Sequence, residues 1–153
     1  MDKVYMELAS RLKEAYGSQL KSVVLFGSHA RGEARLKSDR DILLVIEGLE
    51  RNPLKRMRSL RSLVLDMPVL FNFVTKNPAE LAQNLTPLLL DICVDGKVIY
   101  DDGFFETHRK KGLEALRQAK MRRRRVGGEW CWQFERIPMK EWELTWDGYR
   151  EFT

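Results

Sequence analysis

Residues 27–41 of this chain decide its fold and read GSHARGEARLKSDRD. The stretch opens with Gly27 and Ser28 at the end of an apolar run, and it closes with Asp39 and Asp41 at the start of the next apolar run. Both runs are rich in Val, Leu and Ile, which is typical of strands. The second run is apolar without interruption, as expected for a strand that is covered on both faces. The stretch therefore predicts a strand, a short helix and a second strand.

Each part of this stretch has a physical use in binding a phosphate and a metal. Gly27 allows a tight turn and a close approach to a ligand, and the helix that follows offers unpaired amides to phosphates, with the Ser28 hydroxyl as a further donor. Residues two apart in a strand share one face, so we expect Asp39 and Asp41 to project together toward this turn. Mg²⁺ prefers one or two carboxylates together with phosphate oxygens and water. Either feature alone more often marks an ordinary turn or a solvated strand end, so the prediction depends on their joint spacing.

Hydrophobic periodicity predicts the other elements of an α/β (α+β) fold, with helices packed on a small mixed sheet. The expected helix that begins at Asn52-Pro53 carries Leu54, Met57, Leu60 and Val64 on one stripe, which should pack on the sheet. We expect a first domain over residues 1–102 and an added C-terminal part over 103–153. The expected strands are 20–26, 41–46, 69–75 and 97–100, and the expected helices begin near residues 4, 53, 78, 87 and 104.

The C-terminal part combines a basic run with all four tryptophans of the chain. We expect a long helix over 104–125 that Gly127-Gly128 breaks. A hairpin should then pair the aromatic patch 130–134 with the patch 142–146, with the turn at Ile137-Pro138.

Length and composition predict a globular protein of ordinary size. The chain has 153 residues, of which 44% are hydrophobic and 32% are charged, values that argue against disordered and fibrous classes. Its apolar runs are far shorter than the roughly 18 to 20 residues that cross a bilayer, and its N-terminus lacks the pattern of a secretory signal. We therefore expect a cytoplasmic protein without a membrane span. The two cysteines, Cys93 and Cys131, are expected to be reduced thiols.

The spacing of the motif resembles a known signature. Gly27-Ser28, ten intervening residues and then Asp39-x-Asp41 are similar to the signature of the DNA polymerase beta-like nucleotidyltransferase superfamily, and in particular to its minimal nucleotidyltransferase branch. The resemblance covers about residues 1–102 and implies the nucleotidyltransferase fold. Further similarity to this branch lies in residues 30–35, 38–39 and 95–100.

The resemblance also implies a chemistry for these positions. In such enzymes, magnesium ions held by three carboxylates align a hydroxyl with the α-phosphate of a nucleotide and stabilise the leaving pyrophosphate. It implies that Gly27 and Ser28 bind the triphosphate, and that Asp39 and Asp41 are catalytic and hold the metal. Arg31 lies next to this site and is a candidate for phosphate contact, although a surface arginine on a short helix is as often merely solvated.

This chain departs from the family pattern at the third acid. That acid should fall at about Leu70, and Asn72 is the only polar group on the same predicted strand face. An amide oxygen is a neutral and weaker metal ligand, while a shifted alignment would recruit Asp66 instead. Without a third carboxylate the nucleophile lacks its base, so slow or absent chemistry is the alternative to a complete enzyme.

Three functions are compatible with these residues. The first is a Mg²⁺-dependent nucleotidyltransferase that moves AMP from ATP onto a hydroxyl, and the resemblance implies an antitoxin with a helical HEPN partner. The second is a nucleotide-binding regulatory or antitoxin module without turnover. The third is a nucleic-acid-associated protein that uses the net charge of +5, much of it in Arg122–Arg125, and the tryptophans. Against the third, a charge run commonly complements a helix end, and clustered tryptophans more often serve packing or oligomerisation.

Overall fold

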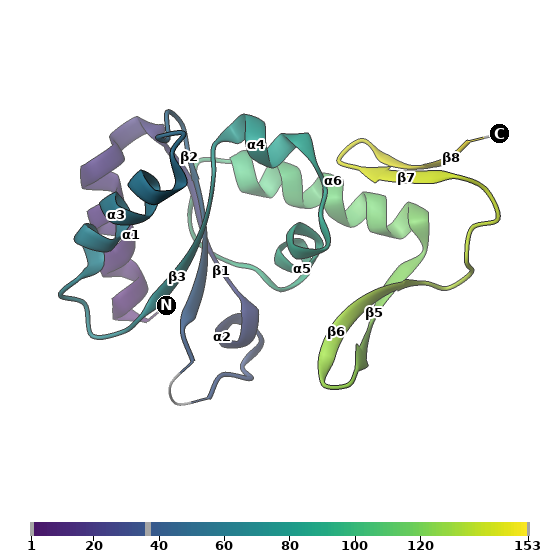
Figure 1. The fold of residues 1–153 in the computed structure, drawn as a ribbon, viewed down its shortest axis with the longest axis horizontal. Coiled ribbons are helices and arrows are strands. Elements are labelled where there is room, and N and C mark those ends of the chain that lie inside the picture. The colour runs from purple at the N-terminus through teal and green to yellow at the C-terminus, as the bar shows by residue number, and fades with distance from the viewer. Residues whose placement is uncertain (1, 36–37, 153) are drawn as a thin grey trace.

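The fold, in a computed structural model that describes residues 2–35 and 38–152, is built on one mixed four-stranded sheet (Figure 1). The strand order is β3-β2-β1-β4, in which β1 runs antiparallel to both of its neighbours and β2 runs parallel to β3. The interior strands β1 and β2 consist almost entirely of buried residues, which confirms the expected central position of the second apolar run. The strands span β1 (Leu20–Phe26), β2 (Arg40–Ile46), β3 (Phe71–Lys76) and β4 (Lys97–Asp101).

Helices cover both faces of this sheet, because alternate residues of β1 and β2 point to opposite sides. Val23 and Leu25 of β1 face one core cluster, with α1 and α3, whereas Val24 and Phe26 face the other, with α4, α5 and α6. Figure 1 shows the two groups of helices on opposite sides of the sheet. The helices span α1 (Lys3–Tyr16), α2 (Gly27–Arg31), α3 (Pro53–Val64), α4 (Pro78–Gln83), α5 (Pro87–Asp95) and α6 (Phe104–Ala119), and a 3₁₀ turn, η1, spans Gly17–Gln19.

The apolar stripe of α3 packs on the core over only part of its length. Leu60 is buried and Val64 packs against the core, but Leu54 is 75% exposed and Met57 is 45% exposed. The expectation that the whole stripe covers the sheet is therefore wrong for the first turns of α3. Asn52 does cap this helix as expected, since its side chain accepts hydrogen bonds from the backbone N–H groups of Leu54 and Lys55.

The basic run is a strand and does not continue α6, which corrects the expected helix over 104–125. The helix ends at Ala119, and Lys120 takes a left-handed backbone with φ of 53°. β5 (Met121–Val126) follows and pairs with β6 (Glu129–Phe134) across Gly127-Gly128. Both glycines have positive φ, as a tight two-residue hairpin turn requires. A turn signal that was interpreted as a helix breaker is thus the turn of a hairpin.

The two aromatic patches do not pair with each other, contrary to expectation. β6 pairs with the arginine strand β5, whereas β7 (Trp142–Thr145) pairs with β8 (Gly148–Glu151). Short loops favour pairing between adjacent segments, and each arginine on the inner face of β5 lies opposite a tryptophan. Arg123 is opposite Trp132, and Arg125 is opposite Trp130.

Two of the tryptophans of the C-terminal part serve packing, and the sequence favoured packing or oligomerisation for them. Trp146 is 8% exposed, and its indole N–H donates to the carbonyl of Leu81 at 2.9 Å. Trp142 packs edge-on against Phe134 with ring centroids 4.8 Å apart. Cys93 and Cys131 are both free thiols, as expected. None of the helices in the described ranges is long and apolar enough to span a membrane.

Candidate nucleotide-binding site

The site begins where β1 ends beside the first residues of β2. Phe26, the last residue of β1, pairs with Asp41, and α2 starts at the next residue, Gly27. Gly27 has a φ of 73°, and a Cβ placed there would overlap Oδ2 of Asp41 and lie 3.1 Å from its Cγ. Only a glycine therefore fits this position, and the carboxylate of Asp41 lies against the turn that was predicted to bind phosphate.

Ser28 and the start of α2 form the other side of this turn. Phe26 at the N-cap makes no side-chain capping hydrogen bond to the first amides of α2. The carbonyl of Ser28 accepts a hydrogen bond of 2.9 Å from the backbone N–H of Glu33, which closes the C-terminal end of the short helix. The hydrogen bond from Glu33 thus fixes the backbone of Ser28, and the N-terminal end of α2 faces Asp41.

Asp39 and Asp41 occupy the expected places relative to β2. Asp39 is exposed and immediately precedes the strand, two residues before Asp41, so the two side chains project from the same side of the strand path. Asp39 also borders a shallow cavity of about 310 Å³, lined by His29, Ser38, Asp39, Arg40, Pro68, Val69 and Leu70. His29 contacts the carbonyl of Ser38 through Nε2 at 3.0 Å, so this histidine ties α2 to the start of β2.

No carboxylate occupies the third position within the described part of the chain. Asn72 pairs with Asp41 in the parallel ladder, and its Nδ2 donates to Oδ1 of Asp41 at 3.0 Å. Leu70 lies just before β3, one step ahead of the Arg40–Phe71 pair, and is therefore level with Asp39. Both of these residues thus lie beside the two aspartates, as the sequence predicted. Among residues 2–35 and 38–152, no three His, Cys, Asp or Glu side chains gather as a metal-binding group.

Asp66 is held away from the site. Its carboxylate is 76% exposed and pairs with Arg11 of α1, with Nη1 and Oδ1 2.6 Å apart. This hydrogen bond lowers the pKa of Asp66. The shifted alignment that would recruit Asp66 as the third acid is therefore wrong.

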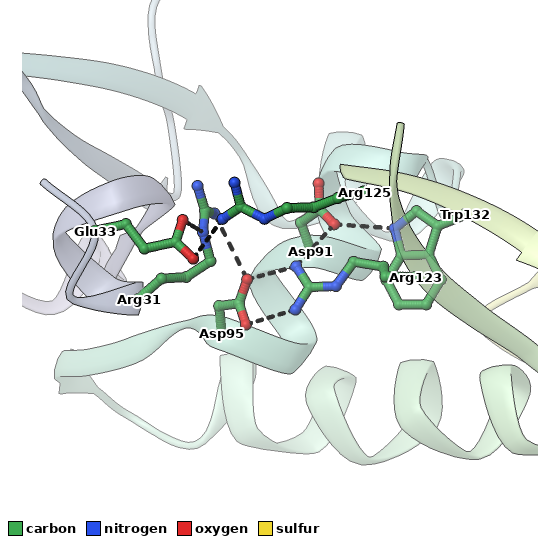
Figure 2. Close-up of polar contacts among 7 residues, drawn as sticks. All are labelled: Arg31, Glu33, Asp91, Asp95, Arg123, Arg125 and Trp132. Carbon is green, nitrogen blue, oxygen red and sulfur yellow. Dashed lines mark hydrogen bonds and ion pairs between the residues drawn. The ribbon is translucent and has the colours of Figure 1, made fainter. Parts of the chain in front are cut away.

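Arg31 lies between two carboxylates. Its Nε donates to Glu33 at 3.1 Å, and its Nη1 lies 3.6 Å from Asp95 of α5 (Figure 2). The structure thus gives this arginine two acidic partners that sequence reasoning did not identify. Its expected contact with a phosphate stays a prediction.

The acidic partners belong to a larger network that sequence reasoning missed. Asp91 and Asp95 are four residues apart, on one face of α5, and both contact Arg123 of β5 (Figure 2). Glu33 is shared between Arg31 and Arg125, and the hydrogen bond from Arg125 is the larger cause of the lowered pKa of Glu33. The signal for this network is the period of two in a strand, which becomes visible only when the basic run is interpreted as a strand.

Comparisons with known proteins agree with this fold. The sequence model of the family described as "Nucleotidyltransferase domain" matches residues 5–118. The chain belongs to this family. The match includes β1, α2, β2 and β3, and thus every residue of the predicted site, and it bears out the resemblance to minimal nucleotidyltransferases. It ends before the β5–β6 hairpin of this nucleotidyltransferase begins.

Two relatives from Methanocaldococcus jannaschii are similar in sequence to this nucleotidyltransferase. The "Putative protein adenylyltransferase MJ1305" is 28% identical over 126 residues, which covers 78% of this chain and 86% of the relative. The "Putative protein adenylyltransferase MJ0604" is 43% identical over 44 residues, or 29% of this chain and 44% of the relative. A crystal structure of a toxin–antitoxin with AMP-PNP superposes with a TM-score of 0.55 at 16% identity, covering 76% of this chain and 89% of that chain. At that identity, the likeness shows the fold alone.

Proposed function

We propose that this nucleotidyltransferase moves AMP from a magnesium-bound ATP onto a hydroxyl of a protein acceptor. The reaction forms a bond between the acceptor oxygen and the α-phosphorus, breaks the bond from that phosphorus to the β-phosphate oxygen, and releases pyrophosphate. The observation that carries the proposal is the close approach of Asp41 to Gly27, which brings a carboxylate against the turn that would hold the triphosphate. Two sequence relatives with adenylyltransferase names support AMP as the transferred group.

The residues of the site fit magnesium. Mg²⁺ usually binds one or two carboxylates and completes its shell with phosphate oxygens and water, which is the donor set that Asp39, Asp41 and a bound triphosphate would supply. When bound, the ion supplies positive charge to the reacting phosphoryl group. Asn72 fixes Oδ1 of Asp41 through its amide, so Oδ2 is left toward the phosphate turn. Gly27 and Ser28 would hold the phosphates by backbone and hydroxyl donors.

A second candidate function is nucleotide binding without efficient transfer. It is favoured by one observation, namely that Leu70 and Asn72 stand beside the two aspartates where the family pattern has an acid. With Asp66 engaged by Arg11, residues 2–35 and 38–152 offer no third carboxylate beside Asp39 and Asp41 to accept the proton of the incoming hydroxyl. In this form the chain would act as a regulatory or antitoxin module by contact alone.

The proposed protein partner is a helical HEPN protein, for which the chain would serve as the antitoxin. This part rests on the resemblance to minimal nucleotidyltransferases, and a toxin–antitoxin crystal structure with the same fold supports it. Nucleic acid is a weaker alternative partner, because the rings of Trp130 and Trp132 already contact arginines of β5.

The test uses ATP labelled on the α-phosphate, with the purified chain and a helical HEPN protein from the same genome as the acceptor. We expect label on the acceptor protein and released pyrophosphate with Mg²⁺, and neither product with an excess of EDTA. Calorimetry with a non-hydrolysable ATP analogue measures binding separately. Binding without label transfer would favour the second candidate, and the absence of both binding and transfer would refute the proposal.

A further inference from the structure

The β5–β6 hairpin lies outside the residues that match the family, yet it reaches back to the predicted phosphate site. The match ends at residue 118, and the hairpin begins at Met121. In Figure 1 the hairpin descends beside α5, on the side of that helix away from the sheet. Figure 2 shows that side chains of the hairpin project from it toward both α5 and α2.

Arg123 anchors the hairpin to α5. Its Nη1 and Nη2 bind the two carboxylate oxygens of Asp95 at 2.6 and 2.8 Å, and Nη1 lies 3.3 Å from Asp91. The side chains of Arg123 and Asp95 are only 12% and 13% exposed, so water screens this bidentate pair little. Trp132 adds a hydrogen bond of 3.0 Å from its indole N–H to Asp91. The hairpin is therefore fixed at the C-terminal half of α5.

Arg125 extends this anchor to α2. Its Nη2 binds Oε1 of Glu33 at 2.6 Å, and the backbone N–H of Glu33 donates to the carbonyl of Ser28 at 2.9 Å. Trp130 lies beside both arginines, with its ring centroid 4.9 Å from the guanidinium of Arg123 and 4.6 Å from that of Arg125. Two contacts thus lead from Arg125 of the hairpin to the serine that is predicted to bind phosphate.

Arg31 closes the network from the side of α2. It contacts Glu33, which Arg125 also holds, and Asp95, which Arg123 also holds. Each of these two carboxylates therefore bridges one arginine of α2 and one arginine of the hairpin. The position of α2 is linked to the hairpin at two separate points.

α2 needs such external support. This helix has five residues, and Ala30 is its one buried residue. A helix of this length is not stable by itself. The two ion-pair bridges supply contacts that its own hydrogen bonds and packing do not. Changes in these bridges should therefore alter α2 more than the sheet, whose core lies elsewhere.

We propose that the β5–β6 hairpin positions the phosphate-binding turn, with Arg125 and Arg123 as positioning residues that act on α2 through Glu33, Arg31 and Asp95. The proposal rests on the proposed function insofar as the turn binds a nucleotide. The hairpin arginines do not contact the phosphates in this role. They hold Gly27 and Ser28 in the geometry that a triphosphate requires, so that less ordering has to occur on binding.

The test compares Arg125→Gln with Arg124→Gln. Arg124 belongs to the same strand and carries the same charge, but it alternates to the opposite face. For each variant, we would measure the dissociation constant for a non-hydrolysable ATP analogue with Mg²⁺, and the hydrogen–deuterium exchange of peptides that cover residues 28–33 without nucleotide. We expect Arg125→Gln to weaken binding about two- to fivefold, as for a partly exposed ion pair, and to speed exchange in α2. Arg124→Gln should change neither quantity.

Two further variants separate positioning from a general structural effect. Arg125→Lys keeps the charge and a donor, so it should recover most of the affinity. Glu33→Gln should speed exchange in α2 at least as much as Arg125→Gln, because Glu33 also holds Arg31. Arg123→Gln should weaken binding more strongly than Arg125→Gln, and its melting curve shows whether it remains folded.

The outcomes distinguish this proposal from the proposed function. Equal exchange and equal affinity in Arg125→Gln, Arg124→Gln and the parent would overturn the positioning role. A parent chain that does not bind the nucleotide would refute the proposed function, but faster α2 exchange in Arg125→Gln alone would still support the link between hairpin and helix. Loss of affinity in Arg124→Gln to the same extent as in Arg125→Gln would show an effect of net charge instead, and would also overturn the proposal.

Discussion

The carboxylate of Asp41 lies against the α-carbon of Gly27, so closely that any side chain at position 27 would overlap it. Gly27 also has a positive φ of 73°, where an L-residue is strained. We expect Gly27→Ala to lower the free energy of unfolding by about 2 to 4 kcal/mol, from backbone strain and overpacking together, and to abolish nucleotide binding. Urea titration measures the first effect and calorimetry the second.

Gly32→Ala is the matched control for this change. Gly32 ends the same short helix with a φ of 71°, but a Cβ there meets no atom within 4 Å. It should cost only the strain of about 1 kcal/mol and leave nucleotide affinity nearly unchanged. If the two variants lose the same affinity, the close approach of Gly27 to Asp41 is not what makes the site.

Asp41→Asn should abolish magnesium-dependent nucleotide binding and leave the fold intact. The change replaces a charged metal ligand by a neutral one of nearly the same shape, which Mg²⁺ binds far more weakly. The nucleotide affinity of the parent should fall when magnesium is chelated, whereas that of the variant should not respond. Full magnesium-dependent affinity in the variant would mean that Asp41 is only a structural residue beside the turn, and thermal melting provides the control for folding.

Asp66→Asn tests whether the acid that precedes β3 belongs to the predicted site. The ion pair with Arg11 lowers the folded pKa of Asp66 below its ordinary value of 3.8. A carboxyl group whose pKa is lower in the folded state stabilises the protein at pH values above its unfolded pKa. This stabilisation is lost as the pH falls through the folded pKa. We therefore expect the variant to melt slightly below the parent at pH 7, and the difference to shrink as the pH falls through the folded pKa, while nucleotide binding and transfer stay unchanged. Loss of transfer at an unchanged melting temperature would return Asp66 to the active site.

Cys93 should resist thiol reagents in the folded protein. Burial raises the pKa of its thiol to about 12, so at pH 8 only about one molecule in 10⁴ carries the reactive thiolate. Cys131 is partly exposed on β6. We expect one thiol per chain to react under native conditions and a second to react in denaturant, as counted by absorbance with a disulfide reagent. Rapid reaction of both thiols in the native protein would contradict the burial of α5 against α6.

The sequence was sufficient for the sheet and for the central part of the site, for a physical reason. Buried strands such as β2 need long apolar runs, and the turn at Gly27 needs a glycine, so both leave local signals. In the C-terminal part, the sequence predicted the wrong end for α6, because four arginines fit the last turn of a helix as well as they fit a strand. Alternation along a strand identifies the inward-facing arginines only when their acidic partners are known. Asp95, the partner of Arg123, is remote from it in the sequence.

The third position of the site shows the same limit. The family pattern indicated Leu70 and the strand period added Asn72, but only the parallel register shows that Leu70 is level with Asp39 and Asn72 with Asp41. Nothing local in the sequence shows that Asn72 already donates to Asp41. The sequence also does not show that Asp66 is bound to Arg11, since that contact joins α1 to a loop 55 residues away.

Leu70→Asp should complete the metal site and raise AMP transfer. The new carboxylate would lie level with Asp39, on the same side as Asp41, and could serve as both a metal ligand and the base for the incoming hydroxyl. A positioned base is worth roughly 10² to 10⁴ in rate. Leu70 is 73% exposed, so we expect the substitution to change the free energy of unfolding by no more than about 0.5 kcal/mol.

Leu65→Asp and Asn72→Asp make this last prediction decisive. Leu65 is 83% exposed and precedes the same strand, so the same substitution there adds an equal charge away from the two aspartates and should not raise transfer. Asn72→Asp places a carboxylate opposite Asp41 and removes the amide that orients it, so it should gain less than Leu70→Asp. The assay follows labelled AMP on a helical HEPN protein from the same genome at saturating ATP and magnesium. Strong transfer by the parent that is unchanged or lost in Leu70→Asp would show that the active site is already complete, with Asn72 in the third position, and the binding-only alternative would then be wrong.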